Sequence, residues 1–399
     1  MDALKGLRVV DFSKVLAGPL CTQYLGDMGA EVIKVEALNG DDTRRWPPFR
    51  DGDGTVFLSA NRNKQSIAID LKTPGGKEVA QRLIASADIL VESFGPGVTE
   101  RLGMDYATLH AQYPSLVYCT ITGFGTEGPL NRGKGYDVIL QAFSGMMSIT
   151  GDDAGPAARS PISPIDQATG MHASIGILAA VIKRMQTGVG THIDACLFDT
   201  SLAFMAYVMQ SYWERHTEPR RWGSAHESLC PYQVFDTSDK PMLLGVANDT
   251  LWQAFCREVN APELAQDPRF TTNADRVAHR SEVLAEVGAR LAPHSCSDWL
   301  ARFSKAGIPC APIHGIGEVL DHPHTQASGM VHHFDVSGHR DLNVIAQPLR
   351  FDGQRPQPSR APPLLGEHTR SILGDLGYDE DQIAAHLASG ALFSRPATV

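Results

Sequence analysis

Strand-like and helix-like segments alternate through the first 120 residues, and this alternation restricts the possible fold more than any other feature. Short apolar runs rich in β-branched residues predict strands at residues 7–12, 31–36, 66–71, 88–92 and 116–121. Helical apolar spacing between these runs covers residues 20–28 and about 73–86. A strand, a helix and a second strand in this order form a parallel pair with a right-handed crossover. We therefore expect an α/β fold with a large doubly wound domain.

The pattern changes near residue 220. Two strand-like runs, 231–237 and 241–246, flank a short polar turn and predict an antiparallel hairpin. Helical spacing follows at residues 249–259, 280–291 and 297–306. The expected ranges are 1–221 for the large α/β domain, 222–320 for a smaller α+β domain, and 321–399 for a linker and C-terminal segment that returns to the large domain. Within that segment, residues 347–363 are expected to be extended and the last nine residues to be poorly ordered.

Composition narrows the class of protein. The chain has 399 residues, is 43% hydrophobic and carries a net charge of -10 without a run of Lys and Arg, so a nucleic-acid partner is not expected. Seven cysteines without a C-x-x-C pair indicate a reducing compartment rather than a disulfide framework. The N-terminus lacks the apolar core of a signal peptide, and no apolar run is expected to reach the length of a membrane span. We expect a cytoplasmic protein that does not interact with membranes.

Residues 164–173, PIDQATGMHA, place one carboxylate at the start of a long apolar helix. The apolar residues that follow run nearly all round this helix, which predicts that it is buried. Asp166 would then feel the partial positive charge of the helix N-terminus, which favours the ionised form. An ionised carboxylate in a sheltered site can act as a nucleophile. The alternative is that Asp166 is only the N-cap of the helix.

Other cofactor and metal signatures are weak. Residues 123–128, GFGTEG, match G-x-G-x-x-G, but Pro129 and a turn-rich stretch replace the helix that would bind a pyrophosphate. The histidines at 322, 324, 332 and 333 lack ligand-type neighbours and are expected in a surface loop rather than in a zinc site. No G-x-S-x-G motif offers a serine nucleophile. Arg62 and Lys64 are expected as solvated surface charges, although basic residues could also converge on phosphate groups.

Several short motifs follow one another along the chain. They are residues 16–19 (LAGP), 29–36 (GAEVIKVE), 40–44 (GDDTR), 61–64 (NRNK), 93–97 (SFGPG), 123–129 (GFGTEGP), 135–137 (GYD) and 362–368 (PPLLGEH). In this order they resemble the family III CoA-transferases, the family of formyl-CoA transferase and carnitine CoA-transferase, over essentially the whole chain. The resemblance implies a large domain with a Rossmann-like sheet that holds no dinucleotide, a small domain, and an interlocked homodimer.

The resemblance also implies a reaction, because Asp166 lies where the family has its catalytic aspartate. Its carboxylate would attack the thioester carbonyl of an acyl-CoA, giving a mixed anhydride and free CoA thiolate. The thiolate would form an aspartyl-CoA thioester and release the first acid, after which the second acid would receive the CoA. Coenzyme A is then a substrate, with no permanently bound cofactor and no metal. Backbone N–H groups at 245–248, or in the first turn after Asp166, are expected to stabilise the oxyanions.

Positions that match the family's CoA contacts imply the same role here for Ile69, Lys72, Phe94, Arg101 and Lys134. Two departures argue against a formyl- or oxalyl-specific enzyme, which stays an alternative. Leu16 replaces a glutamine that closes over the oxalyl group, and residues 245–249 replace a glycine-rich loop.

Residues 220–226 and 231–235 resemble the succinyl-CoA-dependent dicarboxylate CoA-transferases, which act on glutarate, itaconate and citramalate. We therefore expect succinyl-CoA as the donor and a small dicarboxylate as the acceptor. The expected substrate-binding residues are Leu16, Arg44, Tyr136 and His226. Arg44 and His226 are candidates to pair with the distal carboxylate, with a structural role equally open for both.

Two other functions remain as alternatives. An α-methylacyl-CoA racemase shares the fold, but racemases resembling this chain have a histidine in place of Tyr136. Tyrosine suits proton transfer at Cα poorly because it stays protonated near neutral pH. The third possibility is a CoA-binding protein without enzymatic activity.

Overall fold

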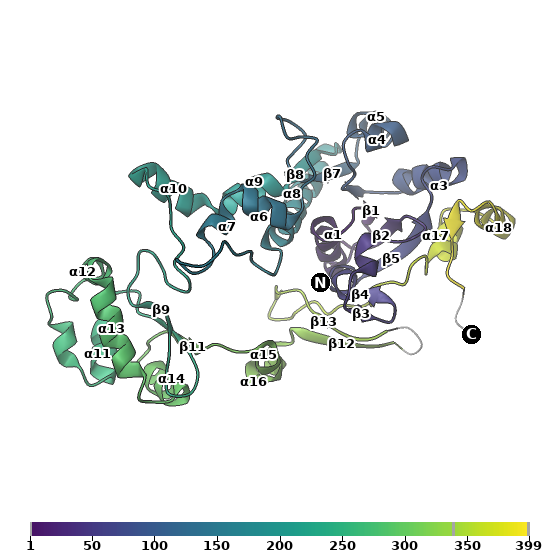
Figure 1. The fold of residues 1–399 in the computed structure, drawn as a ribbon. Helices are drawn as coiled ribbons and strands as arrows, with labels where there is room; N and C mark the ends of the chain where they lie inside the picture. The colour runs from purple at the N-terminus through teal and green to yellow at the C-terminus, as the bar shows by residue number, and fades with distance from the viewer. Residues whose placement is uncertain (1, 337–339, 397–399) are drawn as a thin grey trace. The chain divides into compact units, whose positions relative to one another are not determined.

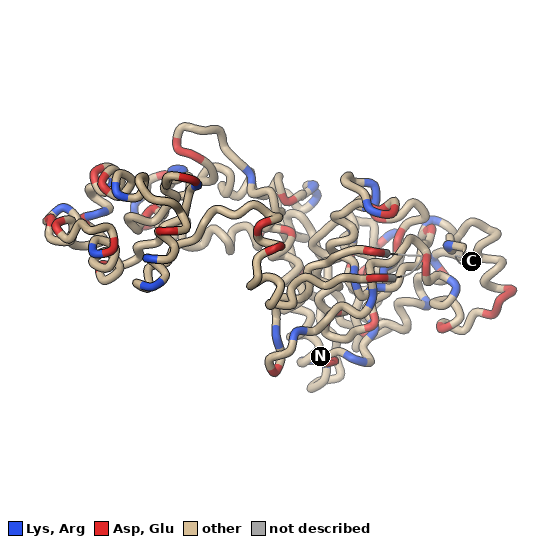
Figure 2. Tube along the Cα trace, turned by 90° about the horizontal axis from the view of Figure 1, so that it is seen from below, with Lys and Arg blue, Asp and Glu red and all other residues tan. Residues whose placement is uncertain are grey.

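The computed structural model describes residues 2–336 and 340–396, which form two compact units. The large unit contains the described residues up to Met146, Ser160–Trp213 and those from Pro323 onward. The small unit contains Met147–Arg159 and Glu214–His322. Basic and acidic residues intermingle along the chain in both units (Figure 2).

The unit boundaries differ from the predicted domain ranges: residues 214–221 and 321–322 group with the small unit, and one internal segment does so as well. Met147–Arg159 groups with the small unit, although it was expected in the large domain. The reason is local hydrogen bonding: the Gly223 N–H donates to the Gly151 carbonyl at 3.0 Å, and Arg221 Nε donates to the Asp152 carbonyl at 3.0 Å.

The large unit is built on a seven-stranded sheet with the order β14-β5-β2-β1-β6-β7-β8 (Figure 1). The strands are β1 (Arg8–Phe12), β2 (Glu31–Glu36), β5 (Lys64–Ile69), β6 (Ile89–Glu92), β7 (Val117–Thr122), β8 (His192–Cys196) and β14 (Leu392–Phe393). Six strands are parallel, and β14 pairs antiparallel with β5. The order reverses between β1 and β6, so the sheet is doubly wound and the expected α/β fold is confirmed.

Helices lie on both faces of this sheet. The helices within the large unit are α1 (Ala17–Asp27), α2 (Thr55–Ala60), α3 (Pro74–Ala85), α4 (Val98–Leu102), α5 (Tyr106–Gln112), α6 (Asp137–Phe143), α8 (Pro164–Thr187), α9 (Leu197–Phe204), α16 (Pro323–Ser328), α17 (Thr369–Asp375) and α18 (Glu380–Ala388). Two further helices, α7 (Met146–Ile149) and α10 (Ala206–Arg215), cross the unit boundaries. Successive strand residues face opposite sides: Val10 packs in the core under α3, α17 and α18, and Val9 packs in the core under α1 and α8.

Helix α8 is only partly buried in this chain. Ile165, Ala173 and Ile177 are fully buried, but the opposite face is not covered. The large apolar side chains exposed on it are Met171, Ile175, Ile182 and Met185. The expectation of burial all round is therefore wrong for the single chain. Contrary to expectation, this helix is also long and apolar enough to span a membrane, and half of its apolar window is buried within the structure.

The small unit confirms the predicted hairpin and helices. Its sheet has the order β11-β10-β9, formed by β9 (Tyr232–Phe235), β10 (Met242–Gly245) and β11 (Cys310–Pro312). Its helices are α11 (Asp249–Glu258), α12 (Asn273–Ala278), α13 (Arg280–Leu291), α14 (Cys296–Lys305) and α15 (Ile316–Asp321). Trp252, Phe255, Trp299 and Phe303 pack together in its core.

Two expectations about the C-terminal segment are wrong. His332 and His333 lie in β12 (Val331–Val336), which pairs with β13 (Arg340–Ile345), rather than in a loop. Their Nδ1 atoms contact the side chains of Gln357 and Asn343. Leu392 and Phe393 of the expected disordered tail form β14, and residues 397–399 lie outside the described part.

Among the described residues, no group of three or more His, Cys, Asp or Glu could hold a metal ion. A two-strand hairpin of β3 (Phe49–Arg50) and β4 (Asp53–Gly54) completes the large unit.

Candidate active site

Asp166 lies in the first turn of α8. The helix begins at Pro164, a favoured first helical residue because its missing N–H would have no helical partner. Ser163, the N-cap, has a φ of 50° and makes no side-chain capping bond. Asp166 is therefore the third helical residue and not the N-cap, and its side chain is half-buried.

The cap of α8 comes from Asp137, the first residue of α6. Its Oδ2 accepts the backbone N–H of Ile165 at 2.8 Å and that of Asp166 at 3.1 Å. The Gln167 N–H donates to the Ser163 carbonyl at 3.2 Å. The N–H groups of Ile165, Asp166 and Gln167 are thus already bonded, which argues against the expectation that N–H groups of this turn stabilise an oxyanion.

The same contacts overturn the expectation that the helix N-terminus favours an ionised Asp166. Burial, and secondly the charge of Asp137, raise the pKa of Asp166 to about 7. A carboxyl group with this pKa is partly ionised at neutral pH and more basic than an ordinary aspartate. Strongly shifted pKa values of this kind occur preferentially at functional sites.

Helix α8 packs lengthwise against α1. Gly170 lies against the backbone of Ala17, and the Ser174 hydroxyl donates to the Cys21 carbonyl at 3.3 Å. Both pairs are separated by 153 residues in sequence, so the two helices run side by side in the same direction. Asp166 lies one turn before Gly170 and therefore at the end of the helix pair where α1 begins.

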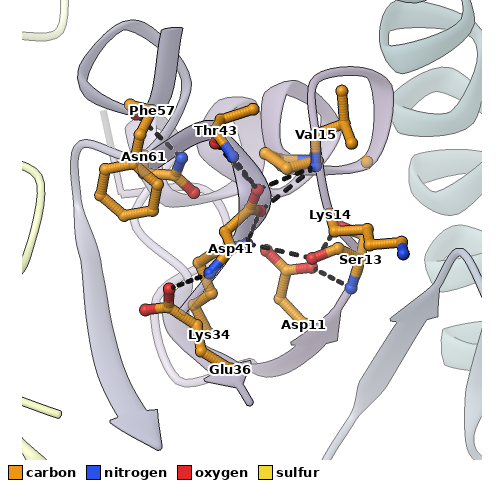
Figure 3. A network of polar contacts seen from close by, with 12 residues as sticks. Asp11, Ser13, Lys14, Val15, Lys34, Glu36, Asp41, Thr43, Phe57 and Asn61 are labelled. Atoms are coloured by element: carbon orange, nitrogen blue, oxygen red, sulfur yellow. Dashed lines mark hydrogen bonds and ion pairs between the residues drawn. The ribbon is translucent and has the colours of Figure 1, made fainter. Parts of the chain in front are cut away.

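A cluster of buried charges holds the turn between β1 and α1 (Figure 3). Val15 has a φ of 71°, which is strained for a β-branched residue, and its N–H donates to the two Asp41 carboxylate oxygens at 3.4 and 3.2 Å. Lys34 Nζ lies 3.1 Å from Asp41 Oδ2. Burial alone would raise the pKa of Asp41, but Lys34 and bonds from Thr43 hold it below its usual value. Leu16, which follows in the chain, is fixed at the end of α1 that lies beside the first turn of α8.

Arg44 belongs to the same buried region. Its Nε and Nη2 donate to the two Glu36 oxygens at 2.7 Å each, and its Nη1 donates to Asp53 at 3.0 Å. Nη2 also donates to the Pro363 carbonyl at 3.1 Å, and the guanidinium stacks over the Phe57 ring. These contacts favour the structural interpretation of Arg44 over substrate binding.

Arg62 and Lys64 are buried, so the expectation of solvated surface charges is wrong for both. Arg62 donates to both oxygens of Asp27, at 3.0 and 2.6 Å. Lys64 Nζ donates to Asp11 at 3.1 Å, and burial lowers the pKa of Lys64 to about 8. Neither side chain is placed to meet a phosphate group.

The five residues expected to contact CoA differ in exposure. Lys72, Arg101 and Lys134 are exposed, and Phe94 is half-buried against an aromatic ring of β1. Ile69 is only 1% exposed and packs in the core. Ile69 and Phe94 lie at the carboxyl ends of β5 and β6, and doubly wound sheets bind ligands at such ends, next to the point where the strand order reverses. There the Lys14 N–H donates to Ser93 Oγ at 3.0 Å, joining the turns after β1 and β6.

The last two substrate candidates belong to different units. Tyr136 is 55% exposed and is the N-cap of α6, directly before Asp137. His226 is half-buried in the small unit, with its ring edge-on to another aromatic ring. In the same unit, the N–H groups of Gly245 and Val246 donate to backbone carbonyls at 2.9 Å each. These two N–H groups are therefore not available to an oxyanion, although the sequence analysis had expected them to stabilise one.

Sequence reasoning missed Asp137 as part of the site. It stands in the GYD motif, which drew attention to Tyr136 instead. The motif gave no sign that this carboxylate caps a helix that begins 27 residues later.

Known proteins resemble this chain over nearly its whole length. Residues 4–369 match the model of CoA-transferase family III. The chain is 39% identical to the succinyl-CoA:glutarate CoA-transferase of Mus musculus, over 98% of this chain and 91% of that protein. It is 35% identical to the succinyl-CoA:mesaconate CoA-transferase of Haloarcula marismortui, over 95% and 98%. A crystal structure of a CAIB/BAIF family protein from Brucella suis superimposes with a TM-score of 0.84 and 36% identity, covering 94% of this chain and 99% of that one. The chain belongs to CoA-transferase family III.

Proposed function

We propose that this protein transfers CoA from succinyl-CoA to a small dicarboxylic acid, with Asp166 as the nucleophile. The observation that carries the proposal is the placement of Asp166: a half-buried carboxylate in the first turn of a core helix, with its pKa raised to about 7. Such a group is more nucleophilic than an ordinary aspartate and is still substantially ionised at neutral pH.

The reaction proceeds in four exchanges. The ionised Asp166 attacks the succinyl-CoA carbonyl, the C–S bond breaks, and an aspartyl-succinyl anhydride and CoA thiolate form. The thiolate attacks the aspartyl carbonyl and releases succinate, leaving an aspartyl-CoA thioester. The acceptor carboxylate attacks this thioester, giving a second anhydride and thiolate. The thiolate then takes the acceptor's acyl group, and Asp166 is regenerated as a carboxylate.

The substrate class rests on relatives and on the small unit. The relatives named above act on glutarate and mesaconate, both dicarboxylates, according to their names. We assign His226 to the distal carboxylate of the acyl group and place Leu16 and Tyr136 beside the reacting carbonyl. Arg44 is left out of this assignment because its donors bind Glu36, Asp53 and a carbonyl oxygen.

For the CoA moiety we assign Lys72, Arg101 and Lys134 to the phosphate groups, because exposed cations can form charge-assisted hydrogen bonds with them. Phe94 offers a half-buried ring for the remaining apolar part. Ile69, which is buried, would contribute only by fixing the end of β5.

We further propose an interlocked homodimer in the cytoplasm. Large apolar side chains that are exposed on one chain often mark an interaction surface, and the second chain would bury them. The side chains concerned are Met171, Ile175, Ile182, Met185, Tyr207 and Trp213. All seven cysteines are free, which suits a reducing compartment. Light scattering on the purified protein tests the dimer directly.

The racemase alternative retains one supporting observation, because a carboxyl group with a pKa of about 7 also suits proton transfer at Cα. Deuterium incorporation at Cα of a 2-methylacyl-CoA in deuterated water, without exchange between acids, would favour it over CoA transfer.

The first experiment incubates the protein with succinyl-CoA and a panel of free acids: glutarate, itaconate, mesaconate, citramalate, malate, oxalate and carnitine. New acyl-CoA thioesters are identified by mass. We expect dicarboxylates to be converted by the native protein and not by Asp166→Ala. A thioester of oxalate alone would favour the formyl/oxalyl type, and turnover by Asp166→Ala would contradict the proposed nucleophile. Retention of CoA binding without any turnover by the native protein would indicate a binding protein.

A further inference from the structure

Helix α6 holds the segment that leads into α8 from one side. Asp137 and Gln141 lie one helical turn apart and are 5% and 0% exposed. Asp137 accepts the first-turn N–H groups of α8. The Gln141 side chain makes two hydrogen bonds to the Ser160 backbone: it accepts the N–H at 2.8 Å and donates to the carbonyl at 3.2 Å. The Gln141 amide also donates to the other oxygen of Asp137.

This arrangement has an electrostatic consequence for Asp166. A carboxylate in the first turn of a helix is normally stabilised as an anion by the free N–H groups there. In α8 those N–H groups face another carboxylate, so Asp166 receives no such bond from them and instead feels a like charge. Desolvation and a neighbouring anion both disfavour ionisation, and together they make the carboxylate more basic.

We propose that Asp137 is a positioning residue for Asp166: its carboxylate fixes the first turn of α8 by accepting the N–H groups there, and it sets a like charge beside Asp166. This inference rests on the proposed function, in which Asp166 attacks the thioester. A more basic carboxylate attacks a carbonyl faster once ionised. Asp137 acts through α8, whose first-turn N–H groups it accepts.

Other charges on neighbouring elements do not explain the effect. Helix α8 packs against α1, α6, α9, β7 and β8. Titratable groups on these elements and on α8 itself include Cys21, Asp27, Cys119, His172, Asp194 and Asp199. Among the described residues, the charge that shifts the pKa of Asp166 is that of Asp137 alone.

The test separates charge from shape. Asp137→Asn keeps an oxygen that can accept both N–H groups but removes the charge. Its NH2 group cannot accept the bond from the Gln141 amide, a loss that Gln141→Ala shares. Gln141→Ala removes the two hydrogen bonds to Ser160 and leaves the Asp137 charge in place, so it is the control for a purely structural effect. The protein is labelled with carboxyl-¹³C aspartate, and the Asp166 signal is identified as the one missing in Asp166→Asn.

We expect Asp137→Asn to lower the titration midpoint of Asp166 by about one pH unit, the size typical of one like charge nearby. Gln141→Ala should lower Tm but leave the midpoint unchanged. The rate of CoA transfer should follow the same midpoints, with a high-pH plateau that is lower in Asp137→Asn by at most about tenfold. An unchanged midpoint in Asp137→Asn, or an equal shift in Gln141→Ala, would overturn the inference. The titration needs no turnover, so a shifted midpoint without any CoA transfer would support the role of Asp137 and count against the proposed function.

Discussion

A Cβ atom at Gly170 of α8 would lie 2.6 Å from the carbonyl oxygen of Ala17 in α1. This approach is closer than side-chain carbons tolerate, so only glycine allows the two helices to pack at this distance. The contact lies one turn from Asp166 and immediately after Leu16. The position of Asp166 relative to the turn after β1 thus depends on the absence of a side chain at Gly170.

We predict that Gly170→Ala destabilises the protein and impairs CoA transfer together. Forcing a methyl group into this contact should lower the free energy of unfolding by about 1–3 kcal/mol, because the helices must move apart. Chemical denaturation and steady-state kinetics measure the two effects. The matched control is Gly374→Ala in α17, where a Cβ meets nothing within 4 Å. Equal stability of the two variants would show that α1 and α8 are not held this closely.

Arg44 gives a second prediction, because its contacts favour structure over substrate binding. Arg44→Met removes the guanidinium that bonds to Glu36 and Asp53 in a buried site, which should lower the free energy of unfolding by about 3–5 kcal/mol. Arg370→Met, which breaks an exposed pair with Glu380, should change it by less than about 1 kcal/mol. Urea denaturation compares them.

The same variant also tests the sequence-based hypothesis for Arg44. At a temperature where Arg44→Met remains folded, the acceptor KM should equal that of the native protein. A sharply raised KM with little loss of stability would return Arg44 to the substrate site.

Asp166 should make stability depend on pH. Its pKa in the folded protein is about 7, against 3.8 for the ordinary group. The folded state therefore binds more protons than the unfolded state between these values, and stability falls as pH rises from about 4 to about 7. Asp166→Asn removes this slope and should be more stable than the native protein above pH 7, by about 2–4 kcal/mol. Below pH 4 the two should agree.

Denaturation curves from pH 4 to pH 8 measure this difference directly. A native protein as stable as Asp166→Asn across the whole range would mean that Asp166 ionises as easily in the folded state as in the unfolded state. The raised pKa, and with it the basis for a strongly basic nucleophile, would then be lost.

The fold was largely predictable because local sequence patterns determine most of its strands and helices. The runs at 31–36 and 280–291 coincide with β2 and α13. The spacing of the apolar residues and the turn residues at the ends are sufficient to define both elements. Strand β14 was missed because two residues carry no period, and its place at the sheet edge depends on pairing with β5.

The sequence pointed to Asp166 through the family resemblance, but it did not show the electrostatic surroundings of this residue. The pKa of Asp166 is raised by burial and then by the charge of Asp137, which lies 29 residues earlier. Arg62 and Lys64 illustrate the same limit. A basic residue before a strand usually lies in solvent, and only the fold places Asp27 and Asp11 beside these two. Charges become structural or catalytic through partners that are distant in sequence.

His226 provides the last prediction, on the acceptor acid. Its Nδ1 accepts the backbone N–H of Ser228 at 3.0 Å, so the neutral ring carries its proton on Nε2. That N–H can donate to the distal carboxylate of a dicarboxylate substrate. A hydrogen bond to a charged group contributes about 1.5–3 kcal/mol, so His226→Ala should raise the acceptor KM about tenfold or more. His226→Gln, which retains an N–H donor, should recover part of this loss. His294→Ala, a change at an exposed histidine of the same unit, should leave the KM as it is, and so should His226→Ala if the histidine has only a structural role.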